Sequence, residues 1–206
     1  MSLYNFSPSY AYGKGTDPYV FWTEGFTNEE LDDIIKIGES KQLQTAKTGT
    51  PLANPDEPDK SLRQTKVSWI KSADAPWLYD KLAYIVNHLN SQYYDYDITG
   101  FYEDFQYGVY TEDSHYGWHI DSGNSVDSDN IDKRPPRKLS ISLQLSDPED
   151  YEGGELQIKN CDNPVNIKKE RGFLCMFPSY TLHRVTPVTK GIRKSLVVWV
   201  TGPRFR

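Results

Sequence analysis

The feature that most constrains the fold is a strict alternation of apolar and polar residues from Leu139 to Ser146, LSISLQLS. Successive side chains of a β-strand point to opposite faces of a sheet. Leucine and isoleucine would therefore lie on one face, and serine and glutamine on the other. The segment predicts a strand with one face in the core and one polar face.

Other β-type runs lie in the same half of the chain. Residues 172–177 (GFLCMF) and 192–200 (IRKSLVVWV) are rich in residues that favour strands, and we expect turns at Pro178-Ser179 and at 188–191. After residue 96 there is no long helical pattern and no detectable repeat. This spacing predicts a sandwich or squashed barrel of about eight strands.

Two helices are expected before this β-rich part. Residues 27–30 (TNEE) form a capping-box sequence, which predicts a helix that runs to about Gly38. Residues 74–76 (DAP) predict the start of a second helix, whose apolar residues follow helical spacing and should pack on a sheet. Short strands are expected within 17–25 and over 63–70.

The segment 45–62 (TAKTGTPLANPDEPDKSL) has no apolar period and is rich in proline, aspartate, threonine and lysine. This composition predicts a loop, and its length favours a lid over a site. A chain of 206 residues is long enough for one domain with a real core. We expect a single domain over 1–206, with support elements and the lid in 1–96 and the β-rich body in 97–206.

The bulk composition excludes several classes of protein. Aromatic residues make up 14% of the chain, far more than in disordered proteins, and the formal net charge of -6 argues against binding nucleic acid. The first residues resemble no signal peptide, and no window approaches about 18 consecutive apolar residues. We expect a soluble, cytoplasmic protein without a membrane partner, in which Cys161 and Cys175 stay reduced. The sequence makes no prediction about oligomeric state.

The first candidate for chemistry is the tripeptide His119-Ile120-Asp121. On a strand, the imidazole and the carboxylate would point the same way, toward one metal ion, while Ile120 faces the opposite side. Such a spacing arises easily by chance. The second candidate changes the balance, because His183 is followed ten residues later by Arg193. His115 is expected in a loop, as an ordinary polar residue.

Together these clusters resemble the Fe(II)/2-oxoglutarate dioxygenases, and within them the prolyl 4-hydroxylase branch with its small microbial PKHD-type members. The family pattern has a tyrosine nine residues before the first ligand, an aromatic residue three before it, H-x-D, a distal histidine and a basic residue ten beyond it. The matching residues are Tyr110, Tyr116, His119, Asp121, His183 and Arg193. The segments YEGGELQI (151–158) and FPSYTLHRVTPVTKGIRKS (177–195) also resemble family segments.

The resemblance implies an α+β, mainly β fold, with a double-stranded β-helix (jelly-roll, cupin-like) core and the N-terminal helices packed on one sheet. It implies that His119, Asp121 and His183 hold Fe(II), with O2 and 2-oxoglutarate as co-substrates and ascorbate in support. The residues that match its co-substrate contacts are Arg193, which would bind the distal carboxylate, Tyr110 and Ser195.

The resemblance also implies the hydroxylation of an unactivated C–H bond in a prolyl residue of a peptide or protein, with release of succinate and CO2. The expected substrate contacts are Tyr116, Arg137, Trp199 and Arg63. Strand parity places Trp199 on the same face as Arg193. Tyr116 would otherwise belong to the core or rim, and Arg137 would otherwise be solvated.

Several alternatives stay open. The same iron site would serve a free amino acid or another small molecule as acceptor. Many peptidyl prolyl hydroxylases have lysine where this chain has Arg193, which weakens the assignment of proline. A nucleic-acid demethylase is disfavoured, since that branch has a second arginine where this chain has Trp199. A cupin-like binding module without chemistry is the most distant reading.

Overall fold

The computed structural model describes residues 17–46, 61–122, 135–160 and 163–204. Within these ranges the chain forms two α-helices, α1 (Asn28–Glu39) and α2 (Pro76–Leu89), and a short π-helical turn (Asn90–Tyr94). The strands are β1 (Val20–Trp22), β2 (Gln44–Thr45), β3 (Arg63–Gln64), β4 (Lys66–Ile70), β5 (Phe105–Tyr110), β6 (His115–His119), β7 (Arg137–Gln144), β8 (Tyr151–Gly153), β9 (Leu156–Asn160), β10 (Asn163–Asn166), β11 (Leu174–Pro178), β12 (His183–Val185), β13 (Val188–Gly191) and β14 (Arg193–Thr201).

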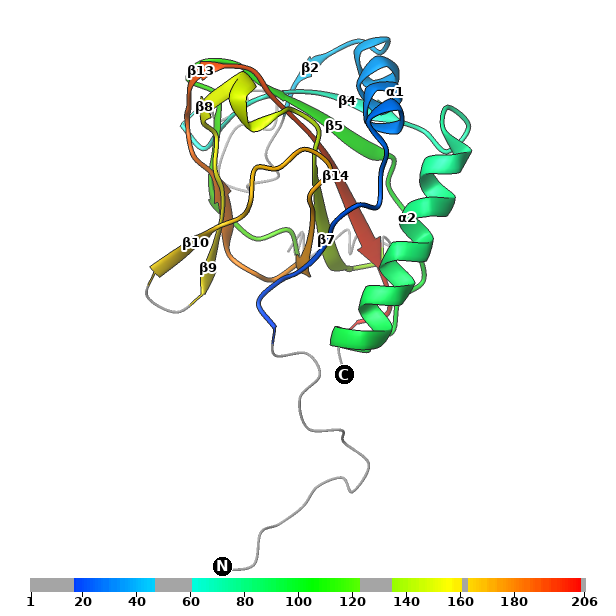
Figure 1. Ribbon diagram of the computed structural model, residues 1–206. Coiled ribbons are helices and arrows are strands. Elements are labelled where there is room, and N and C mark those ends of the chain that lie inside the picture. The colour runs from blue at the N-terminus through cyan, green and yellow to red at the C-terminus, as the bar shows by residue number, and fades with distance from the viewer. Residues whose placement is uncertain (1–16, 47–60, 123–134, 161–162, 205–206) are drawn as a thin grey trace, which may run out of the picture.

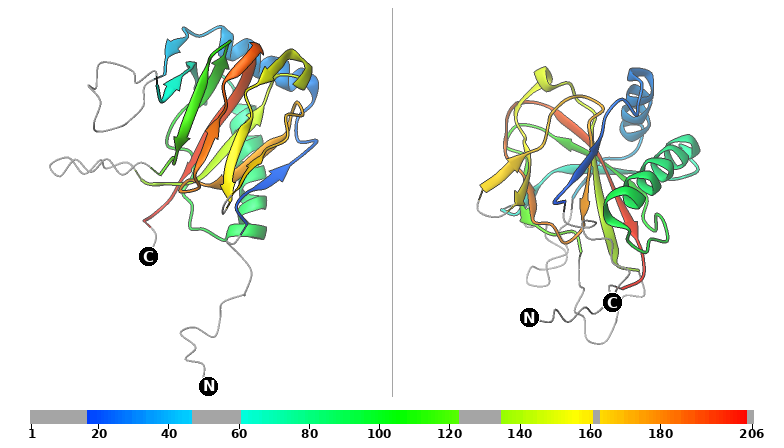
Figure 2. Two further views of the ribbon diagram at one scale, coloured as in Figure 1. Left: turned by 90° about the vertical axis from the view of Figure 1, so that its left-hand side faces the viewer. Right: turned by 60° about the horizontal axis from the view of Figure 1, so that its bottom comes forward.

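Two antiparallel sheets make up most of the fold. The larger has seven strands in the order β1-β11-β7-β14-β5-β4-β2, and the smaller has five in the order β10-β9-β12-β6-β3. Strands β8 and β13 form a separate ribbon. Helices α1 and α2 cover one face of the larger sheet, and the smaller sheet lies on its other side (Figure 1). Seen from that other side, the strands stand in front of the helices (Figure 2). The prediction of a mainly β fold with N-terminal helices on one sheet is confirmed.

Strand β7 shows how the alternating sequence builds two different interiors. Leu139, Ile141 and Leu143 are buried in the core shared with the helices, as predicted. Ser140 and Gln144 point to the other face, yet they are buried too, between the two sheets. The polar face of this strand therefore lines the interior in which the candidate site lies.

Both helices follow the sequence pattern closely. Thr27 caps α1 in the predicted capping box with Glu30, and the helix ends one residue beyond the predicted Gly38. Helix α2 begins at Pro76, as predicted, and buries its apolar stripe against the larger sheet. The reason that Gly38 stands in α1 is packing: the Ser68 hydroxyl donates to its carbonyl, and the ring of Tyr107 lies against its Cα.

We expect Gly38→Ala to destabilise the protein, although alanine favours helices. A Cβ at this position would lie 2.4 Å from the Cγ atom of the buried Tyr107 ring. Overpacking of a core costs about 1–3 kcal/mol, against a gain of at most about 1 kcal/mol in helix propensity. Urea unfolding should show a net loss of about 1–2 kcal/mol. Asp33→Ala, on the exposed side of α1, is the control, and an equal or higher stability for Gly38→Ala would contradict this packing.

Three expectations about the strands were wrong. The strand predicted over 63–70 is two strands, since β3 pairs with β6 in the smaller sheet and β4 pairs with β5 in the larger one. Thr65 makes the transition, and its carbonyl accepts a hydrogen bond from Ala46. The predicted turn at 188–191 is strand β13, which pairs with β8. The estimate of about eight strands was too low, because short edge strands extend both sheets.

Some expectations fall on residues that the structure does not describe. Most of the predicted lid at 45–62 cannot be compared with the structure, because residues 47–60 are outside the described ranges. Cys161 is outside them as well. Cys175 is buried between the sheets, and burial raises the pKa of its thiol. The division at residue 96 stays a prediction, although strands from before that point join both sheets. Among the described residues, no helix is long and apolar enough to cross a membrane.

Candidate active site

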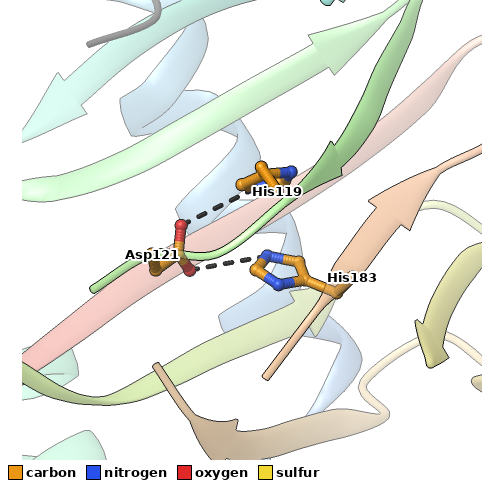
Figure 3. Close-up of side chains that lie close together, drawn as sticks. All are labelled: His119, Asp121 and His183. Carbon is orange, nitrogen blue, oxygen red and sulfur yellow. Dashed lines mark ion pairs between the residues drawn. The ribbon is translucent and has the colours of Figure 1, made fainter. Parts of the chain in front are cut away.

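Two histidines and one aspartate meet between the sheets (Figure 3). His119 ends β6, His183 begins β12, and antiparallel pairing places these two residues directly opposite each other. Asp121 lies 3.6 Å from His119 (Oδ1 to Nε2) and 3.5 Å from His183 (Oδ2 to Nε2). All three candidate ligand atoms fall within 4.8 Å of one another. The structure thus brings together the three residues that the sequence singled out.

The side chains of His119 and Asp121 point to the same place, as the H-x-D spacing predicted, but Asp121 is not part of the strand. Strand β6 ends at His119, so Asp121 lies just beyond it, and Ile120 faces away and is exposed. The position of Asp121 is fixed instead by its backbone N–H, which donates to the Ser179 carbonyl at 2.8 Å. Ser179 was not anticipated, since no sequence pattern marks a backbone carbonyl as a partner.

Both imidazoles are held in the form that binds a metal ion. Nδ1 of His119 lies 2.8 Å from the Gly117 carbonyl, and Nδ1 of His183 lies 2.9 Å from the Thr181 carbonyl. A carbonyl only accepts, so each Nδ1 must carry the proton, and each Nε2 presents its lone pair toward Asp121. Such outer hydrogen bonds orient ligating histidines in metal sites.

Burial and mutual charge also favour a neutral His119 beside an ionised Asp121. Burial, followed by the nearby His183, lowers the pKa of His119 to about 4. Burial alone would raise the pKa of Asp121, but electrostatic interaction with His183 and His119 holds it below its ordinary value. The Ser140 hydroxyl and the Trp199 indole N–H act in the same direction, although the indole N–H does not reach hydrogen-bonding geometry.

This low pKa predicts an acid-sensitive metal-free protein. The folded His119 stays neutral down to about pH 4, whereas the unfolded residue takes up a proton below about 6.5. The contribution of the neutral His119 to the free energy of unfolding is therefore fully present above pH 6.5, and the free energy falls by up to about 3 kcal/mol as the pH drops toward 4. Urea unfolding at a series of pH values measures this slope. His119→Gln should flatten it, and a constant stability of the wild type over this window would contradict the assignment.

A β-bulge decides which neighbours of His119 face the site. The pairing of β6 with β12 shifts by one residue between His119 and Tyr116. A bulge adds a residue to one strand and so reverses the alternation beyond it. As a result the Tyr116 ring stacks on His119, with 3.5 Å between ring centroids. His115 turns away, and its ring nitrogens meet the carbonyls of Asp113 and Ser61.

His115 therefore lies outside the metal cluster, as expected, but the expected loop position was wrong, because it is the first residue of β6. Simple strand parity would have placed it on the same side as His119. The bulge is a property of the pairing with β12, and the only local signal for it is Gly117 inside the strand.

Arg193 forms a second centre between the sheets, on the face of β14 that strand parity predicted. Its side chain is 1% exposed, and its guanidinium donates to Gln144 at 2.6 Å and to Ser195 at 3.2 Å. It also lies over the ring of Tyr110, its partner across β5 and β14, at 5.0 Å from the centroid. Gln144 in turn donates to the Tyr151 hydroxyl. Gln144 and Tyr151 were missed, although Gln144 belongs to the polar face of the alternating strand.

The residues present fit a divalent metal ion with an anionic co-substrate. Two imidazoles and one carboxylate on one side of a shared point are a donor set that suits Fe(II) and leaves adjacent positions open. Arg193 makes no ion pair with any carboxylate of the described residues, and its Nε has no hydrogen-bond partner there. A buried cation without a counter-charge is costly, and a bound dicarboxylate would satisfy it.

The other expected substrate contacts lie beside the metal ligands. Trp199 is buried, and the Arg137 guanidinium lies over its ring at 3.8 Å. Arg137 also makes two hydrogen bonds to Glu103, of 2.6 and 2.5 Å. Arg137 is therefore not simply solvated, and Glu103 is a partner that its sequence position did not reveal. Arg63 lies over Tyr116 at 4.4 Å.

Comparison with known proteins agrees with this geometry. Residues 105–201 match the model of the 2OG-Fe(II) oxygenase superfamily, and the matched segment contains the whole His-Asp-His cluster together with Arg193. This part of the chain belongs to the 2OG-Fe(II) oxygenase superfamily. The predicted resemblance is confirmed.

The curated relatives carry the name PKHD-type hydroxylase. One from Aliarcobacter butzleri is 40% identical over 95 residues, which are 46% of this chain and 41% of that protein. One from a Synechococcus strain is 42% identical over 85 residues, which are 41% of this chain and 37% of that protein. The chain thus matches less than half the length of these relatives.

Solved structures share the fold over almost the whole chain. A Pseudomonas putida prolyl-4-hydroxylase has a TM-score of 0.69 at 17% identity, covering 92% of this chain and 95% of its own. A Trichoplax adhaerens prolyl hydroxylase, in complex with a peptide fragment of hypoxia inducible factor, has a TM-score of 0.72 at 18% identity, covering 91% and 84%. At such identities the likeness is one of fold, and it confirms the predicted double-stranded β-helix.

Proposed function

We propose that this protein is an Fe(II)- and 2-oxoglutarate-dependent dioxygenase that hydroxylates an unactivated C–H bond in a prolyl residue of a peptide or protein. The observation that carries the proposal is the largely buried cluster of His119, Asp121 and His183, in the same interior as a buried Arg193 that forms no ion pair within the described part of the chain. A 2-oxo dicarboxylic acid that binds a metal ion at one end requires a site for the metal ion and a positively charged partner for its distal carboxylate. The superfamily match supports the same conclusion.

Each residue has a defined task in this proposal. His119, Asp121 and His183 hold Fe(II), which when bound with 2-oxoglutarate and O2 supplies the oxidising chemistry and yields succinate and CO2. Arg193 binds the distal carboxylate of 2-oxoglutarate through its paired donors, with Ser195 and Tyr110 beside it. The surrounding buried residues exclude water from the reacting centre. Ascorbate would keep the iron reduced.

The prolyl substrate is the finer part of the proposal. The comparison structures include prolyl hydroxylases, one of them in complex with a peptide. In this chain Trp199 provides an aromatic ring near Asp121, and such rings suit contact with proline. Tyr116 lies between His119 and Arg63 and would present only its edge to the substrate. Arg137 is held by Glu103 against Trp199, and in this proposal it would orient a peptide carbonyl.

The test is a screen for succinate release with Fe(II), ascorbate and 2-oxoglutarate. Acceptors would include proline-containing peptides, matched peptides with alanine in place of proline, and free amino acids. Mass spectrometry should then find one added oxygen atom on proline. Turnover driven only by acceptors without proline would refute the prolyl assignment but keep the oxygenase. An absence of 2-oxoglutarate turnover with every acceptor would refute the oxygenase itself.

A further inference from the structure

Arg63 is a second buried arginine that crosses the space between the sheets. It lies on β3, at the edge of the smaller sheet, and is only 7% exposed. Its Nη2 donates to the side chain of Gln106 at 2.8 Å, and Gln106 belongs to β5 in the larger sheet. Its Nε is buried without a hydrogen-bond partner among the described residues. Part of the donor capacity of this guanidinium is therefore unused.

The guanidinium packs against the aromatic ring that stacks on a candidate metal ligand. It lies 4.4 Å from the centroid of the Tyr116 ring, and the His119 ring stacks on Tyr116 at 3.5 Å. A stacked imidazole fills one face of the tyrosine, so the guanidinium must occupy the other. Arg63, Tyr116 and His119 form a column that ends at a candidate metal ligand. The guanidinium itself is therefore separated from that ligand by a single aromatic ring.

Charge distinguishes Arg63 from the other arginines of this region. Arg137 is neutralised by Glu103, and Arg193 is assigned to 2-oxoglutarate in the proposed function. Arg63 makes no ion pair with any carboxylate of the described residues, and Asp121 is engaged by both histidines. A buried cation without an anion is destabilising, and a bound carboxylate would supply the missing charge.

We propose that Arg63 is a binding residue for a carboxylate of the acceptor substrate, held beside Tyr116 and apart from the 2-oxoglutarate site at Arg193. This inference rests on the proposed function and narrows its substrate class to acceptors with an anionic group near the oxidised carbon. The carboxylate has two possible sources: the main-chain carboxylate of a free amino acid, or an acidic side chain next to the target residue in a peptide.

The experiment compares acid and amide forms of the same acceptor. The pairs are free proline against prolinamide, and a proline-containing peptide with aspartate beside the proline against the same peptide with asparagine. The enzyme carries Fe(II), 2-oxoglutarate and ascorbate, and kcat/KM is measured for each member. A charge-assisted hydrogen bond predicts a preference for the acid of at least about tenfold in one pair. The preferred pair identifies the source.

Arg63→Gln should abolish this preference while leaving the KM for 2-oxoglutarate unchanged, and Arg63→Lys should restore part of it. Arg184→Gln is the matched control. Arg184 lies in the same sheet as Arg63 and has similar contacts: it donates to Gln157 at 2.7 Å and lies over the Trp118 ring at 4.6 Å. Because it follows His183 directly in β12, its side chain points to the opposite face of the sheet. It should keep the preference.

An equal loss for acid and amide in Arg63→Gln would show that Arg63 is only structural, and the absence of a preference in the wild type would also overturn the inference.

If no acceptor turns over, binding replaces turnover as the readout. Thermal unfolding of the protein with Mn(II) and 2-oxoglutarate is then measured with proline or acetate against prolinamide or chloride. If proline or acetate raises the unfolding temperature of the wild type but not of Arg63→Gln, the inference is supported. If neither carboxylate stabilises the wild type, the inference is refuted. A missing stabilisation by 2-oxoglutarate itself would instead count against the proposed function.

Discussion

Asp121→Ala is expected to abolish 2-oxoglutarate turnover and to weaken Fe(II) binding by at least about 10²-fold. Asp121 supplies the only negative charge of the cluster, and both imidazoles direct their Nε2 atoms toward it. Without it, two neutral donors remain, which cannot offset the cost of dehydrating a divalent cation. Even residues that only support metal ligands typically contribute 10–100-fold to metal affinity, so a ligand should contribute at least as much.

The variant must be shown to fold, because Asp121 also accepts hydrogen bonds within a buried site. Circular dichroism and thermal unfolding of the metal-free protein provide that check, and Fe(II) or Mn(II) binding is measured by calorimetry. His115→Ala is the control, since His115 is four residues from His119 but bonds only to backbone carbonyls. Turnover that persists in both Asp121→Ala and His119→Ala would show that the metal site lies elsewhere.

Arg193→Gln should raise the KM for 2-oxoglutarate by about 10²-fold or more, with little change in metal affinity. The side chain is fully buried and holds its guanidinium between Gln144 and Ser195, where a carboxylate would receive two charge-assisted hydrogen bonds. Each such bond contributes about 1.5–3 kcal/mol. Arg193→Lys retains the charge but not the paired donors, so an intermediate loss is expected.

Steady-state kinetics over a range of 2-oxoglutarate concentrations, with calorimetry for the metal ion, separates the two sites. Lys194→Gln is the matched control, because Lys194 follows Arg193 on β14 but points to the opposite face and pairs with Glu39. Such a partly exposed ion pair contributes little to stability. An unchanged KM in Arg193→Gln would refute this residue as the carboxylate partner.

Local patterns in the sequence predicted the elements whose stability is local. The capping box at Thr27 and the proline at 76 give the starts of both helices, because these signals act within one turn. The alternation along β7 predicts its two faces, because side-chain direction in a strand depends only on position. The ligand set was predicted from spacing together with resemblance to a family, since His119 and Asp121 alone would have been weak evidence.

Tertiary structure decided which residues meet the site and with what charge. The bulge in β6, which turns Tyr116 inward and His115 outward, arises from the pairing with β12. The change of sheet at Thr65 brings Arg63 into the interior. Only the packed fold shows that Glu103 neutralises Arg137 while Arg63 and Arg193 have no carboxylate partner among the described residues. Sequence determines which charges a chain carries, but their pairing depends on distances between segments far apart along it.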